Sequence, residues 1–207
     1  MKALLQRVTR ASVRVGGEVV GEIARGLVVL VGIAVKDTEE DARYLAQKVV
    51  TLRIFADGGG KFNLSAMDVA GELLLISQFT LMADTRRGRR PSFIEAAPPA
   101  QAAELFQYFV EQMRATGLKI ATGRFQEYMQ VEIHNDGPVT VLLDRQEEKP
   151  ENWPFRLPPL PPMVRNWKNP TPEDLKAQVD WDREWGADQT KMLEWLWEQR
   201  CKSGLPD

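Results

Sequence analysis

Tryptophan and proline are distributed unevenly along this chain, and the change limits the size of its main fold. All six tryptophans and nine of the thirteen prolines lie beyond residue 145 of the 207. Residues 1–144 carry 17 basic and 17 acidic side chains, and the remaining 63 residues carry 10 and 12. We therefore predict a first domain of residues 1–144, a typical domain size, followed by a Pro/Trp-rich extension of residues 145–207.

The extension is expected to start as an irregular strap, because five prolines between residues 154 and 162 favour extended backbone. Thr171 and Pro172 then resemble a helix N-cap and first position. Trp181, Trp185 and Trp197 would give the helical part an apolar side. We expect this side to fold back on the first domain or on a partner subunit. The alternative is a surface for a nucleic acid or another protein.

In the first domain, local patterns predict several strands. Residues 26–35 form a continuous apolar run rich in β-branched side chains, which is typical of a central strand. Gly16-Gly17 separates a loosely alternating strand pattern at residues 2–15 from a second strand at residues 18–23 and predicts a tight hairpin. Residues 72–79 form another apolar strand. Two final strands are expected at residues 128–134 and 139–143, with a hinge at residues 135–138.

Two helices complete the domain. One follows Thr38, a predicted N-cap with acidic residues after it, and the other starts at Pro98-Pro99. The second helix has an expected buried stripe of Leu105, Phe106, Phe109, Val110 and Met113. The fold class is therefore α+β: a mostly antiparallel sheet with two main helices, on one face or on both, and a partly helical C-terminal extension. Periodicity does not give the strand order.

Charge and composition restrict the function. The net charge is −2, so any contact with RNA must come from a local patch. The run at residues 26–35 is too short to span a bilayer, and the first ten residues lack a secretory signal. One cysteine, Cys201, can form neither an internal disulfide nor a metal cluster. We expect a cytoplasmic protein without metal or cofactor.

The sequence also lacks the motifs of the usual catalytic triads and phosphate-binding loops. His134 is the single histidine, and neither a Gly-x-Ser-x-Gly elbow nor a Gly-x-x-x-x-Gly-Lys loop occurs. An enzyme built on this sequence must therefore rely on positioning, on backbone donors or on its substrate.

Three segments carry polar groups that could act on a substrate. Ser77-Gln78-Phe79-Thr80-Leu81 ends an apolar strand, although its hydroxyls could simply cap a turn. A second segment lies between two strands: Asn135-Asp136-Gly137-Pro138-Val139-Thr140. Taken by itself, its Asp-Gly-Pro pattern predicts only a turn. Arg86, Arg87, Arg89 and Arg90 surround Gly88 and suit a loop that contacts phosphates, or a solvated charge run.

Taken together, these segments resemble the D-aminoacyl-tRNA deacylase family over residues 1–144. The start of the chain, from Gln6 to Ala11, is similar to the family's N-terminus. Residues 77–81 and 135–140 look like its two signatures, the second being the Gly-cis-Pro motif. Residues 89–93 and 122–125 resemble its connecting stretches. All five segments occur in the family's order and spacing, and the extension lies outside the resemblance.

The resemblance implies that the mostly antiparallel sheet is a barrel-like β-layer, as in the deacylase-type fold. It also implies an RNA-dependent esterase that is a homodimer with active sites at the interface. Each pocket would combine Ser77, Gln78, Phe79 and Thr80 of one subunit with Gly137 and Pro138 of the other. The substrate would be tRNA carrying a D-amino acid or glycine, including glycine mischarged on tRNA(Ala). The Gly-cis-Pro motif would reject L-amino acids, and the 2′-hydroxyl of the terminal ribose would assist hydrolysis.

The resemblance also implies roles for two further residues. Arg7 would brace the cis-proline loop, and Phe125 with its neighbours would stack on the adenine. Two alternatives come from other functional classes. A non-catalytic module could bind the 3′ end of tRNA or another RNA, or a hydrolase could act on small esters without RNA. Hydrolysis of D-aminoacyl-tRNA, compared with that of a free D-amino-acid ester, distinguishes all three.

Overall fold

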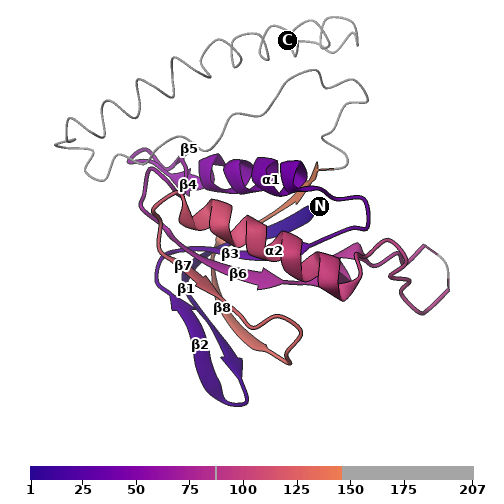
Figure 1. The fold of residues 1–207 in the computed structure, drawn as a ribbon. Coiled ribbons are helices and arrows are strands. Elements are labelled where there is room, and N and C mark those ends of the chain that lie inside the picture. Colours follow the sequence, from indigo (N-terminus) through magenta and orange to yellow (C-terminus); the bar gives the residue numbers. More distant parts are fainter. Residues whose placement is uncertain (87, 146–207) are drawn as a thin grey trace, which may run out of the picture. The chain divides into compact units, whose positions relative to one another are not determined.

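A computed structural model describes residues 1–86 and 88–145, and the extension predicted at 145–207 lies outside the described residues beyond Arg145. These residues form an α+β fold in which a mixed sheet carries both helices on one side (Figure 1). The elements in chain order are β1 Lys2–Val15, β2 Glu18–Ile23, β3 Gly26–Gly32, α1 Glu39–Thr51, β4 Phe55–Ala56, β5 Phe62–Leu64, β6 Glu72–Ser77, a 3₁₀ turn η1 Phe79–Met82, α2 Pro99–Arg114, β7 Ile120–Thr122 and β8 Gln130–Asp144.

The strand order is β2-β1-β3-β6-β7, and β8 also pairs with β1. The pairs of β1 with β2, β3 and β8 are antiparallel, whereas β3–β6 and β6–β7 are parallel. The predicted hairpin is confirmed, since Gly16 and Gly17 both have positive φ, at 57° and 87°. A separate two-stranded hairpin, β4–β5, follows α1.

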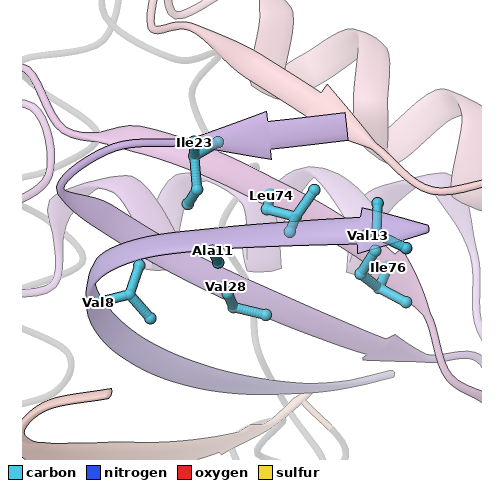
Figure 2. Packing of buried hydrophobic residues seen from close by; sticks show 7 residues of the cluster. All are labelled: Val8, Ala11, Val13, Ile23, Val28, Leu74 and Ile76. Carbon is cyan, nitrogen blue, oxygen red and sulfur yellow. The ribbon is translucent and has the colours of Figure 1, made fainter. Parts of the chain in front are cut away.

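The sheet is nearly closed, which agrees with the barrel-like layer that the resemblance implies. A Cβ atom on Gly21 of β2 would lie 2.8 Å from the carbonyl oxygen of Thr122 in β7, so the two ends of the sheet nearly touch. Figure 2 shows the buried cluster inside this curved sheet, to which β1, β2, β3 and β6 contribute. Its members are Val8, Ala11, Val13, Ile23, Val28, Leu74 and Ile76.

Both helices start and pack as their sequences predict. Thr38 caps α1 in a reciprocal capping box with Asp41, which accounts for the helix start. In α2 the buried side chains are the five expected ones: Leu105, Phe106, Phe109, Val110 and Met113. The two helices lie against each other on the sheet, so the alternative with both on one face is the observed one.

The C-terminal part of the sheet differs from the sequence prediction. Instead of two hinged strands, residues 130–144 form one strand, β8, interrupted by a bulge. Val8 of β1 pairs with Asn135, and Gln6 pairs with Thr140, so residues 136–139 together face the single residue Arg7. Pairing with β1 on both sides of the bulge keeps the two halves in one strand.

Candidate active site

A pocket of about 700 Å³ opens where β3 and β6 end. Its floor comes from the sheet, one wall from the segment before α2 and the other from the loop between β7 and β8. The lining residues are Val31, Ile33, Ile76, Ser77, Gln78, Phe79, Phe93, Ala96, Ala97, Pro98, Pro99, Ala102, Phe125, Gln126, Glu127, Tyr128, Met129 and Val131. The floor is continuous with the core, because Ile76 also belongs to the buried cluster inside the sheet. The pocket is thus mostly apolar with a polar edge, which suits a small organic group.

The polar edge is made by the end of β6 and the turn that follows it. The sequence analysis predicted that this strand ends at residue 79, but β6 already ends at Ser77. The turn η1 then starts at Phe79. Gly32 allows this turn to approach β3, since a Cβ there would lie 2.9 Å from the Cβ of Leu81. Ser77, Gln78 and Phe79 line the pocket, whereas Thr80 stands beside it and accepts a hydrogen bond from the side-chain amide of Gln78.

One backbone donor in this segment is already engaged. The amide of Gln78 donates to the carbonyl oxygen of Val31 at 2.7 Å, which fixes the turn to β3. The first amides of a helical turn have no acceptor within that turn. In η1 these are the amides of Phe79, which lines the pocket, and of Thr80, which is next to it in the chain.

Aromatic side chains form the walls of the pocket. Phe79 and Phe93 contact each other with ring centroids 5.0 Å apart, and Phe125 lies 6.4 Å from Phe106 of α2. Sequence reasoning proposed Phe125 but missed Tyr128, whose side chain is 89% exposed at the pocket. The sequence prediction placed Tyr128 at the start of the strand expected at residues 128–134, whereas in the structure it lies in the loop before β8.

Arg7, Gly137 and Pro138 lie together, away from the residues that line the pocket. The Arg7 guanidinium donates to the carbonyl oxygen of Ile54 at 2.7 Å and to that of Asp136 at 3.2 Å, and it also pairs with the Asp136 carboxylate. The Gly137–Pro138 peptide bond is cis, and both residues are exposed. A buried arginine therefore holds an outward-facing bulge in place.

The arginine-rich loop before α2 is closed at its base. Asp84 and Ser92 exchange two backbone hydrogen bonds of 2.8 and 2.9 Å. The Asp84 carboxylate accepts two hydrogen bonds from the Arg86 guanidinium, and this arginine holds the pKa of Asp84 well below its usual range. Arg89 and Arg90 are exposed, and Arg87 lies outside the described residues. Arg86 is therefore partly neutralised within the loop.

Within residues 1–86 and 88–145, no three His, Cys, Asp or Glu side chains gather as a metal site would require. In the same part of the chain, no helix is both long and apolar enough to cross a membrane. Glu127 and Tyr128 are the titratable side chains among the described residues that line the pocket. His134 instead contacts Glu132 at 2.7 Å on the sheet.

Comparison with known proteins decides the family. The family model described as D-Tyr-tRNA(Tyr) deacylase matches residues 4–144. The chain belongs to this family. A D-aminoacyl-tRNA deacylase of Dehalococcoides mccartyi (strain ATCC BAA-2266 / KCTC 15142 / 195) is 59% identical over 147 residues, which cover 71% of this chain and 96% of that protein. One of Fervidobacterium nodosum is 56% identical over 147 residues, 71% and 99% of the two chains.

Two solved structures are similar to this chain in fold. A structure titled c-Myc DNA Unwinding Element Binding Protein has a TM-score of 0.67 and 47% identity, covering 70% of this chain and 98% of its own. A probable eukaryotic D-amino acid tRNA deacylase shares the fold, with a TM-score of 0.61 and 16% identity over 69% of this chain and 97% of its own. Membership of the D-Tyr-tRNA(Tyr) deacylase family confirms the resemblance predicted from the five segments.

Proposed function

We propose that this protein is a D-aminoacyl-tRNA deacylase, a carboxylic ester hydrolase that releases a D-amino acid and tRNA from mischarged tRNA. The observation that carries the proposal is the family match over residues 4–144, together with a relative that is 59% identical. The pocket supports it, because a mostly apolar cavity with one polar edge can hold an aminoacyl group and present its ester to backbone donors.

In the proposed reaction, water attacks the carbonyl carbon of the ester and negative charge develops on the carbonyl oxygen. The amides of Phe79 and Thr80 would donate to that oxygen, and Ser77 and Gln78 would position the aminoacyl group. The bond to the ribose oxygen then breaks. The 2′-hydroxyl of the terminal ribose assists, which suits a pocket whose described lining contains no histidine. The adenine would stack on Phe125, as unpaired bases do on aromatic side chains.

The chiral filter is proposed to come from a second copy of the chain. Gly137 and Pro138 face outward on a bulge that Arg7 holds rigid, which suits a role in the pocket of a partner subunit in a homodimer. Backbone from the partner would fill the space that an L side chain needs. A D side chain would point elsewhere, and glycine, including glycine on tRNA(Ala), has no side chain to reject.

The tRNA backbone is proposed to contact the arginine-rich loop. Arg89 and Arg90 are exposed and lie four and three residues before Phe93 of the pocket wall, which supports contact with phosphates near the 3′ end. Arg86 contributes less, because Asp84 already binds it. Arg87 is part of the same proposal and lies outside the described residues. The cytoplasm, where tRNA is charged and used, is the proposed location.

One experiment tests the activity. Purified protein is incubated with D-tyrosyl-tRNA, L-tyrosyl-tRNA and the ethyl ester of D-tyrosine, and release of the amino acid is measured. We expect rapid hydrolysis of D-tyrosyl-tRNA alone. Hydrolysis of the D- and L-forms at equal rates would contradict the chiral filter, and hydrolysis of the ethyl ester would favour an esterase that ignores RNA.

The alternative is a non-catalytic module that binds nucleic acid. The 47% identical structure is that of a protein named for DNA binding, which favours this alternative. Binding of D-tyrosyl-tRNA or of DNA without release of the amino acid would support the binding module and contradict the deacylase.

A further inference from the structure

The small hairpin β4–β5 lies against Arg7, the residue that holds the Gly137–Pro138 bulge. The Arg7 guanidinium carbon is 6.0 Å from the centre of the Phe55 ring and 5.3 Å from the centre of the Phe62 ring. Phe55, the first residue of the hairpin, is fully buried, whereas Phe62, on its second strand, is 52% exposed. Packing of the core explains Phe55 but gives no reason for an exposed phenylalanine at position 62.

The hairpin is built to hold Phe62 in a fixed place. The Asp57 carboxylate accepts hydrogen bonds from the amides of Gly59 and Lys61, at 2.8 and 3.0 Å, and from the side chain of Asn63 at 2.5 Å. Phe62 therefore lies between two residues that are tied to Asp57. Its ring faces a guanidinium, and a cation beside the face of an aromatic ring is stabilised.

Arg7 in turn has little freedom once the ring is in place. Its Nη1 donates to the Ile54 carbonyl oxygen just before the hairpin, and its Nε donates to the Asp136 carbonyl oxygen in the bulge. Its Nη2 lies directly under the bulge, 3.0 Å from the position that a Cβ of Gly137 would occupy. A small rotation of the guanidinium would therefore move the support of the bulge.

We propose that Phe62 is a positioning residue for chiral selection: its ring holds the Arg7 guanidinium in the orientation that supports the Asp136–Val139 bulge. This inference rests on the proposed function, in which that bulge rejects L-amino acids. Phe62 itself need not touch the substrate. It acts through Arg7, so its loss should affect discrimination between D- and L-substrates more than binding of tRNA.

The test compares Phe62→Leu, which removes the ring but keeps apolar bulk, with Phe62→Tyr, which keeps the ring. Val19→Ala, at an exposed apolar position of β2, is the control for an unrelated surface change. For each variant, the deacylation rates on D- and L-tyrosyl-tRNA and the melting temperature are measured. We expect Phe62→Leu to lower the ratio of the two rates about two- to fivefold. Phe62→Tyr and Val19→Ala should keep the ratio of the original protein.

A ratio that stays unchanged in Phe62→Leu would overturn the inference. So would an equal loss of both rates, because a purely structural role lowers activity without changing selectivity. Failure of the proposed function would be seen in the original protein and is therefore a separate result. If that protein shows no preference for D-tyrosyl-tRNA, both the proposed chiral filter and the role of Phe62 are contradicted.

Discussion

Gly137 offers a direct test of the bulge, because the structure gives it a backbone that other residues avoid. Its φ is +126°, and a Cβ at this position would lie 2.8 Å from Cγ2 of Val139 and 3.0 Å from Nη2 of Arg7. For Gly137→Ala, the backbone conformation alone costs about 1–3 kcal/mol. In a chain of this length that lowers the melting temperature by about 2–12 °C. The methyl group must also displace the Val139 side chain or the guanidinium.

The two effects can be separated by a second glycine. Gly16 also has positive φ, +57°, but a Cβ there meets nothing within 4 Å. Gly16→Ala should therefore lose about 1–2 kcal/mol of stability and keep its preference for D-tyrosyl-tRNA. Gly137→Ala should lose both stability and preference, as measured by thermal melting and by the ratio of D- to L-deacylation rates. A Gly137→Ala protein with the original stability and the original ratio would refute this reasoning.

Three further predictions concern other parts of the domain. The double variant Arg89→Ala/Arg90→Ala should bind tRNA with a weaker salt dependence: the slope of the logarithm of the binding constant against the logarithm of the salt concentration should decrease in magnitude by about 1–2. An unchanged slope would show that these two arginines do not bind the tRNA backbone. Hydrogen bonds from Lys119 and the Ala24 amide lower the pKa of Glu72, so its stabilisation is present above about pH 4.5 and is lost as the pH falls further. The difference in melting temperature between the original protein and Glu72→Gln should therefore shrink in acid; a constant difference would contradict the ion pair. Thr38→Ala should cost about 1 kcal/mol in chemical denaturation through loss of the N-cap, whereas no loss would contradict the capping box.

Local signals predicted the elements of the fold well. The apolar run at residues 26–35 contains β3, which ends three residues earlier, at Gly32. The cap at Thr38 and the stripe of α2 correctly predicted both helices. The parallel pairing of β3 with β6 was not predictable, because periodicity carries no information about partners far along the chain. Strands β4, β5 and β7 have two or three residues each, too few for alternation to show.

The candidate site was predictable only where a motif marks it. Ser77–Thr80 and Phe125 were identified from sequence, but the wall from Phe93 to Pro99 needs the three-dimensional fold. Arg7 shows why. Its charge groups it with the polar side chains, yet it alternates in step with buried Ala3 and Leu5. The alternation then changes phase, so Arg7 and Val8 are both buried. The bulge in β8 at the same point causes that change, and a single strand cannot reveal it.

Ile76 has a consequence for attempts to redesign this protein. The same side chain fills the interior of the curved sheet and forms part of the pocket floor. A substitution at position 76 therefore changes the volume of the pocket and the stability of the fold together. Trimming Ile76 to valine would widen the pocket by one methyl group and remove about 0.5–1.5 kcal/mol from the fold. A variant that accepts larger aminoacyl groups through a smaller side chain at position 76 would therefore be less stable. Substitutions at the exposed Tyr128 can change the pocket without removing buried apolar surface.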